Sequence, residues 1–133
     1  MITFRYKKEP SAITGEVLRP VADVVLECGR SRVEAAMYID SGADVTMIPL
    51  GLGKALGLKQ APADEILEIK GVSGSGVPYI LKKAAIILNG EKLKIRLAWA
   101  LIEEVPFLLG RMDIFPRFRI TFDEKRELVT FDK

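Results

Sequence analysis

Hydrophobic and polar residues alternate along most of the chain, and this pattern predicts β-strands. Residues 2–6 alternate with a period of two. Residues 21–28 are rich in β-branched side chains, and a second strand pattern follows at 32–39, after a turn at 29–31. These runs predict a pair of strands joined by a tight turn, preceded by a separate N-terminal strand.

Further hairpins are predicted in the second half of the chain. Asn89-Gly90 separates two apolar runs, and this dipeptide favours a two-residue hairpin turn. Three glycines fall within residues 71–76, between alternating runs, which predicts a hairpin with a glycine-rich tip. Additional strands are expected at 105–109 and, as a last hairpin that turns at 123–126, at 118–122 and 128–131.

Helical signals are short and few. Pro49 suits the first turn of a helix, residues 50–56 can continue it, and Gly57 can end it with a positive φ angle. A second short helix is expected at 111–115, ahead of Pro116. The chain is therefore predicted to be all-β with one or two short helices.

The composition refines this picture. A length of 133 residues suits one domain, so we expect a single domain over residues 1–133, with residues 1–20 as an N-terminal extension of unassigned role. The 49% of hydrophobic residues is high for a small soluble protein, as expected if a second copy covers part of the surface. The 20 basic and 18 acidic residues nearly balance, which favours neither a nucleic acid nor a membrane as partner. With no signal-peptide or membrane-span pattern, we expect a cytoplasmic protein.

The sequence contains no histidine and a single cysteine, Cys28. Neither a Ser-His-Asp triad nor a Cys-His pair can therefore form within the chain. Zinc sites built from histidine or from several cysteines are excluded as well. Any catalysis would rest on carboxylates, lysines or hydroxyls, and we expect no metal or other cofactor.

The strand predicted at 32–39 ends in Asp40, Ser41, Gly42 and Ala43, a run of turn-forming residues. Such a turn can aim the Asp40 carboxylate into a cleft while backbone N–H groups and the Ser41 hydroxyl hold it. Taken alone, the tripeptide Asp-Ser-Gly favours an ordinary Asx-type turn. The pattern around it therefore decides how it is interpreted.

That pattern resembles the retroviral-type, or retropepsin-like, aspartic peptidases. Residues 39–44 (IDSGAD) are similar to the active-site segment of that family, and residues 107–111 (FLLGR) resemble its second landmark. Residues 69–80 lie in the place of its glycine-tipped flap. The resemblance covers residues 21–122, and it implies a closed β-barrel-like acid-protease subunit with a flap hairpin.

The resemblance also implies a role for each residue of the turn. Asp40 would be the catalytic acid. Ser41 would hydrogen-bond across a dimer axis, so that two such turns brace each other. Gly42 would leave room for substrate and offer its carbonyl group, and Ala43 would complete the supporting turn.

Outside the turn, the resemblance implies residues for dimer and substrate contacts. Asp44 would bind the substrate backbone and pair with Arg111, beside Gly110, which would steady a dimer. In the retroviral enzymes the chain termini form the dimer sheet, and here the longer N-terminus and the C-terminal hairpin depart from that pattern. The flap residues Val72, Ser73, Gly74, Ser75 and Gly76 would close over the substrate, and Val72, Val77, Ile80 and Leu109 would line its pockets.

The chemistry implied by the resemblance needs two carboxylates around one water molecule. The chain contains a single Asp-Ser/Thr-Gly segment, so the second carboxylate must come from another subunit. A two-fold axis would supply it as Asp40 of the partner subunit. The sequence therefore predicts a homodimeric aspartic endopeptidase that acts on peptides or proteins.

Three alternatives remain at this level. The domain could keep the fold as a catalytically inactive peptide-binding or dimerisation module. It could bind nucleic acid through a set of basic residues near its C-terminus. It could also be a structural β-barrel in which the Asp40 turn has no chemical role. The basic residues of the second alternative are Arg111, Arg117, Arg119, Lys125 and Arg126.

Overall fold

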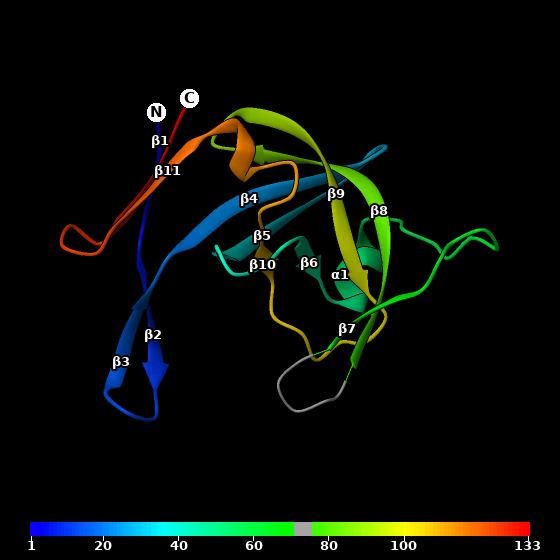
Figure 1. Ribbon diagram of the computed structural model, residues 1–133, viewed down its shortest axis with the longest axis horizontal. Helices are drawn as coiled ribbons and strands as arrows, with labels where there is room; N and C mark the ends of the chain where they lie inside the picture. Colours follow the sequence, from blue (N-terminus) through cyan, green and yellow to red (C-terminus); the bar gives the residue numbers. More distant parts are fainter. Residues whose placement is uncertain (71–75) are drawn as a thin grey trace.

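The computed structural model describes residues 1–70 and 76–133. The described chain is built mainly from strands (Figure 1). No helix among these residues is both long and apolar enough to span a membrane. The elements are β1 (Ile2–Arg5), β2 (Lys7–Ser11), β3 (Gly15–Arg19), β4 (Val21–Cys28), β5 (Ser31–Ile39), β6 (Thr46–Ile48), α1 (Leu50–Ala55), β7 (Leu67–Lys70), β8 (Gly76–Leu88), β9 (Glu91–Ala100), β10 (Leu108–Leu109), the 3₁₀-helix η1 (Phe115–Arg117), β11 (Arg119–Asp123) and β12 (Leu128–Asp132).

One sheet closes on itself. Its strand order is β4-β5-β10-β6-β9-β8-β7, and β4 also pairs with β8, so the strands from β4 to β8 form a closed barrel. Closure leaves β7 as the strand that extends beyond the barrel, paired antiparallel with the start of β8. The expectation of an all-β, closed barrel is therefore confirmed.

Alternation along β5 shows how the sequence builds this barrel. Ala35, Met37 and Ile39 are buried, whereas Ala36 faces outward and Tyr38 is half-buried. Successive side chains of a strand point to opposite faces, so the buried set fills the interior and the other set faces away from it. The apolar interior continues around the barrel, and it includes Leu26, Leu97 and Leu109, which are fully buried.

The predicted turns and first helix are confirmed. Asn89 and Gly90 both have positive φ angles, 45° and 91°, as expected for the two-residue turn between β8 and β9. Helix α1 follows Pro49, and Gly57 leaves it with a φ angle of 80°. A side chain at Gly57 would be strained by that backbone conformation.

Two predicted elements differ in the structure. The strand expected at 105–109 is reduced to β10, because Pro106 has no N–H group to donate to a ladder. The helix expected at 111–115 is replaced by η1, which lies further along and contains Pro116. Asp113 has a φ angle of 67°, in the left-handed region, and this interrupts a right-handed helix at its centre.

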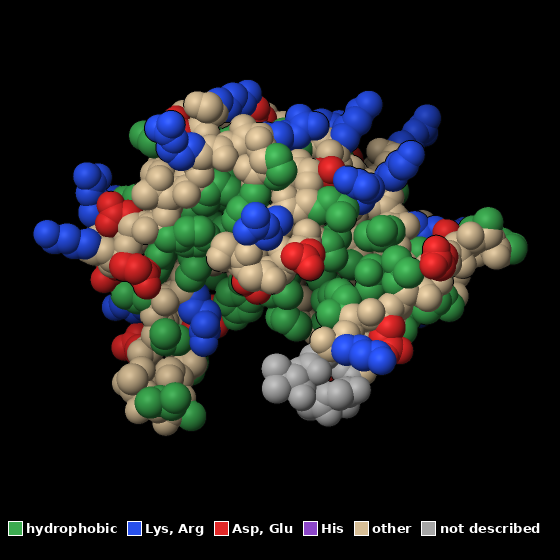
Figure 2. All heavy atoms as spheres, in the orientation of Figure 1, with side chains coloured by type: hydrophobic (Ala, Val, Ile, Leu, Met, Phe, Trp, Pro, Cys, Tyr) green, Lys and Arg blue, Asp and Glu red, His purple; other side chains and the backbone are tan. Residues whose placement is uncertain are grey.

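The two chain ends belong to a second sheet with the order β1-β12-β11. Both edges of β12 are thereby paired within the chain, and the termini lie side by side (Figure 1). Strands β2 and β3 form a separate two-stranded hairpin, residues 7–19, which we call the arm. Figures 1 and 2 show the arm projecting from the body of the molecule.

Candidate active site

The turn at Asp40 is held by its own backbone. Asp40 directly follows β5 and its side chain is half-buried. The amide of Ala43 donates to the Asp40 carbonyl oxygen at 3.1 Å, which closes the turn. The amide of Gly42 donates to the Asp40 carboxylate oxygen Oδ1 at 2.9 Å. One carboxylate oxygen is therefore fixed by the turn.

The segment around Gly110 packs directly against this turn. The Asp40 amide donates to the Leu109 carbonyl oxygen at 3.0 Å, and the Arg111 amide donates to the Ala43 carbonyl oxygen at 2.9 Å. These bonds tie both ends of the turn to β10 and the residues after it. The structure thus brings together the two segments that the sequence singled out, residues 39–44 and 107–111.

Gly110 has to be glycine for the two segments to approach this closely. A Cβ atom at Gly110 would lie 2.4 Å from the backbone carbonyl carbon and oxygen of Val45, and 2.9 Å from the Ala43 carbonyl oxygen. Those atoms are backbone atoms that cannot rotate aside. The amide of Gly110 donates to the Thr46 hydroxyl at 3.1 Å, inside the barrel.

Arg111 contacts the turn differently from the expected pairing. Its Nη1 donates to the Ser41 carbonyl oxygen at 3.4 Å, and its guanidinium carbon lies 6.0 Å from the centre of the Phe115 ring. Among the described residues of this single chain, the Asp44 carboxylate and Arg111 form no ion pair. Asp44 is tied instead through its carbonyl oxygen, which accepts from the Met112 amide at 2.9 Å.

A pocket of about 470 Å³ opens beside Asp40. Its wall includes Tyr38, Leu108 and two arm residues, Glu9 and Arg19. The Tyr38 hydroxyl donates to Glu9 at 2.7 Å, and this bond, followed by burial and the charge of Glu9, raises the pKa of the Tyr38 hydroxyl. Sequence reasoning missed these wall residues, because only the folding of the arm brings it to the end of β5.

An apolar wall lies next to the site. A cluster of Val45, Met47, Ala98 and Ala100 forms its base, separate from the main core. Half-buried side chains pack against this cluster from the β7–β8 hairpin and from β10. They include Ile69, Val77, Tyr79 and Leu108. Such a surface suits apolar side chains of an extended ligand.

Two of the expected pocket-lining residues lie elsewhere. Ile80 and Leu109 are only 2% and 0% exposed, so both belong to the interior of the barrel. Leu108, the neighbour of Leu109, takes the position facing Asp40, because side chains alternate along the strand. Gly76 begins β8, and the predicted flap residues Val72, Ser73, Gly74 and Ser75 lie outside the described residues.

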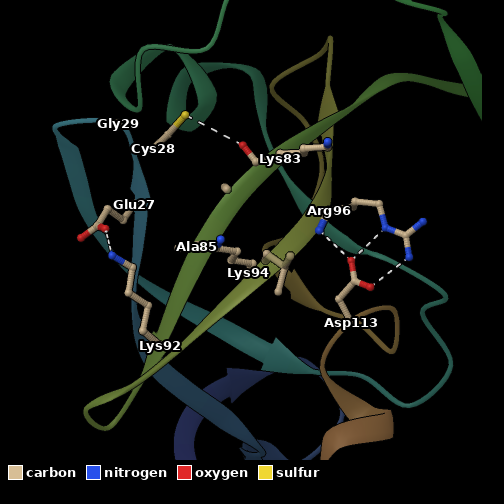
Figure 3. A pocket seen from close by; sticks show the side chains of 11 residues that line it. Glu27, Cys28, Gly29, Lys83, Ala85, Lys92, Lys94, Arg96 and Asp113 are labelled. Atoms are coloured by element: carbon tan, nitrogen blue, oxygen red, sulfur yellow. Dashed lines mark hydrogen bonds and ion pairs between the residues drawn. The ribbon is translucent and has the colours of Figure 1, made fainter.

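A cavity of about 560 Å³ lies at the opposite end of β4 and β5, near Cys28 (Figure 3). Both carboxylates that line it form ion pairs, Glu27 with Lys92 and Asp113 with Arg96. The hydrogen bond from each cation holds the pKa of its carboxyl partner below the usual value. Within the described residues, no group of three or more His, Cys, Asp or Glu side chains is arranged to hold a metal ion. The half-buried carboxylate of Asp40 in its fixed turn is the stronger candidate for chemistry.

Comparison with known proteins agrees with this geometry. The chain is similar to a solved structure of EIAV protease complexed with an inhibitor, with a TM-score of 0.55 and 23% sequence identity. The match covers 70% of this chain and 82% of the other. No family model and no curated protein sequence matches the chain. The protein therefore has the fold of a retroviral protease.

Proposed function

We propose that the protein is an aspartic endopeptidase that works as a homodimer, with one Asp40 from each subunit in its active site. The observation that carries the proposal is the Asp40 turn, in which the Gly42 amide fixes one carboxylate oxygen at the end of a barrel strand. The fold supports it, since the similar solved structure is a protease with an inhibitor bound. The apolar wall beside Asp40 offers a surface for substrate side chains.

The reaction follows from two carboxylates held close together. Two such groups do not ionise together easily, so the pair shares one proton. The ionised carboxylate takes a proton from water as the water oxygen adds to the scissile carbonyl carbon, and the protonated one donates to the carbonyl oxygen. The tetrahedral intermediate then breaks at its C–N bond, while the pair protonates the departing amine.

The second carboxylate is assigned to a second copy of the chain. No other aspartate of the sequence lies in an Asp-Ser/Thr-Gly segment. Ser41 is exposed at the tip of the turn, where it can contact its counterpart across a two-fold axis. The proposed active site is therefore incomplete in one chain.

The test is cleavage of an unfolded protein between about pH 3 and pH 7, a range that includes the protonation of a carboxylate pair. Three proteins are compared: the wild type, Asp40→Asn, and Asp132→Asn as a matched control at an exposed position. Asn at position 40 can still accept from the Gly42 amide, so the turn should persist. We expect activity in the wild type and the control, and none in Asp40→Asn.

Molecular mass is read by light scattering on the same samples. We expect a dimer for all three proteins, because the substitution at position 40 removes a charge and keeps the shape. Cleavage that persists in Asp40→Asn would contradict the mechanism. A wild-type dimer that cleaves nothing at any pH would favour the alternative, a peptide-binding or dimerisation module of the same fold.

A further inference from the structure

The outer part of the arm, residues 7–19, is not supported by any other strand that the structure describes. Its two strands pair only with each other within the described residues. A hairpin of two strands is at best marginally stable in water on its own. Its tip exposes 93% of the Ile13 side chain. Figure 2 shows it standing clear of the body, with hydrophobic atoms at its end.

The root of the arm is fixed at the active site. The Glu9 carboxylate accepts from the Tyr38 hydroxyl at 2.7 Å, and Arg19 lies over the Tyr38 ring with its guanidinium carbon 6.0 Å from the ring centre. Lys7 and Asp23 form an ion pair at 2.5 Å. These contacts orient the arm, whose strands of five residues are each about 17 Å long, root included.

A partly apolar groove of about 720 Å³ begins on the other side of the same turn. We call it the C-terminal groove. It starts at Ser41 and Asp44 and continues past Phe115 and Phe118 to Phe122, which is itself 37% exposed. Phe115 and Phe118 are half-buried, so the groove presents partly covered aromatic side chains that a partner could cover further.

In the proposed homodimer, the two-fold axis passes beside the Asp40 turn, between the arm and this groove. The arm lines the pocket at Asp40, and the groove begins at Ser41, so the two features flank the turn. In a two-fold interface, a feature that lies to one side of the axis in one subunit faces the surface that lies to the other side of the axis in the partner subunit. The arm of one copy then points to the C-terminal groove of the other, and the contact occurs twice.

The sheet formed by the chain ends leaves one edge of β1 and one edge of β11 unpaired among the described strands. Strand β12 is paired on both edges, with β1 and β11, inside one chain. The last strand therefore has no free edge to offer to a second copy. The arm extends away from the body on the side of Asp40.

We propose that the β2–β3 arm of each copy docks in the C-terminal groove of the other, with Ile13 buried at the contact. The inference rests on the proposed function, because the axis is located by the shared pair of aspartates. The two arm contacts hold the subunits together beside the active site.

The test measures the dimer dissociation constant of the wild type, Ile13→Asp and Ile66→Asp by sedimentation equilibrium. Ile66 is the matched control, an isoleucine that is 59% exposed outside the arm and the groove. Neither substitution disturbs the core. We expect Ile13→Asp to raise the dissociation constant about tenfold or more, since each dimer loses two buried isoleucines, and Ile66→Asp to leave it unchanged.

Cross-linking gives a second, direct measurement. In a Cys28→Ala background, a chain with Ile13→Cys is mixed with a chain with Phe122→Cys and treated with a short bis-maleimide. We expect covalent dimers of the two different chains. A chain with Ile66→Cys in place of Ile13→Cys should give none. The design reports only contacts between chains, because each chain carries one cysteine.

Cleavage by the wild type and by Asp40→Asn is measured on the same preparations, which separates the two proposals. One outcome is that cleavage depends on Asp40 while no cross-link forms and Ile13→Asp leaves the dimer unchanged. That outcome would overturn the arm contact, and the proposed function would stand. A cross-linked dimer weakened by Ile13→Asp but without cleavage would support the contact and overturn the function. A wild-type monomer at all concentrations would overturn both.

Discussion

The amide of Gly110 donates a hydrogen bond to the hydroxyl of Thr46 at 3.1 Å, between the neighbouring strands β10 and β6. Thr46 is fully buried, and within the described residues it is the one polar side chain in the buried set. The bond connects the start of β6 to the residue that follows β10. Those two elements flank the Asp40 turn, so this buried contact fixes the frame in which the carboxylate is held.

Replacing Thr46 by valine tests that role. Thr46→Val keeps the volume and leaves the Gly110 amide without an acceptor. A buried donor without a partner costs about 1–3 kcal/mol of stability. We expect a fall of that size in the free energy of unfolding, measured by urea denaturation, together with reduced cleavage. Thr46→Ser keeps the hydroxyl and should retain more activity than Thr46→Val; equal activity would argue against the bond.

Gly110 itself should not tolerate a side chain. In Gly110→Ala the new Cβ atom would meet Val45 backbone atoms at 2.4 Å, so the segment has to move away from the turn. We expect a loss of stability of about 1–3 kcal/mol and a larger loss of activity, because the turn depends on this packing. Thermal unfolding and cleavage rates measure the two effects.

Gly51→Ala is the matched control for that substitution. Its Cβ atom would meet the Glu103 side-chain oxygen at 2.7 Å, and this long exposed side chain can rotate aside at the cost of the hydrogen bond that it accepts from the Gly51 amide. Gly51 lies in α1, where alanine is favoured over glycine. The helix preference of alanine offsets the lost bond, so we expect a smaller loss of stability than in Gly110→Ala. A similar loss at both glycines would mean that the close approach at Gly110 is not the cause.

Local patterns predicted most of the barrel and the Asp40 turn. Alternation predicted β4 and β5, and the Asn89-Gly90 dipeptide predicted the β8–β9 hairpin, because these features depend on neighbouring residues. The pairing of β1 with β12 joins the two ends of the chain, and no local pattern carries that information. Pro106 and the positive φ angle of Asp113 explain why the strand expected at 105–109 and the helix expected at 111–115 differ in the structure.

The candidate site was predicted in the same uneven way. The two segments around Asp40 and Gly110 could be found because both have distinctive sequences. Glu9, Arg19 and Tyr38 could not, since their contacts depend on where the arm folds back against β5. Leu109 was assigned to the pocket in place of Leu108, because the sequence does not show which side of so short a strand faces the barrel interior.

The pair of Arg96 and Asp113 should make stability depend on pH. Arg96 donates to both carboxylate oxygens of Asp113 at 2.9 Å, and these bonds hold the pKa of Asp113 below its usual value of about 3.9. A carboxyl with a lowered pKa stabilises the folded state above its unfolded-state pKa. That contribution is lost as the pH falls through the lowered value.

The variant Arg96→Gln should therefore be less stable than the wild type at pH 7, and the difference should shrink below about pH 4. Urea denaturation across that range measures it. Arg30→Gln is the control, because Arg30 is exposed and forms no ion pair in the described part of the chain. A difference between Arg96→Gln and the wild type that stays constant with pH would exclude the carboxylate as its source.

Arg111 should act on the dimer through the turn that it contacts. Its Nη1 donates to the Ser41 carbonyl oxygen, and Ser41 lies at the tip that would meet the partner subunit. Removing the side chain in Arg111→Ala frees this carbonyl and loosens the tip. We expect the dimer dissociation constant to rise about tenfold, as for the loss of one hydrogen bond to a charged group, with cleavage falling in parallel at low protein concentration.

Concentration separates a weakened dimer from a damaged site in this variant. If Arg111 acts on assembly, raising the protein concentration of Arg111→Ala should restore the cleavage rate per active site toward that of the wild type. Arg111→Lys keeps the charge without the planar donor group, and we expect an intermediate dissociation constant. Arg30→Ala, which removes an arginine at the far end of β5, should leave the dissociation constant unchanged. A dissociation constant in Arg111→Ala equal to that of the wild type would show that the arginine serves only the fold of its own chain.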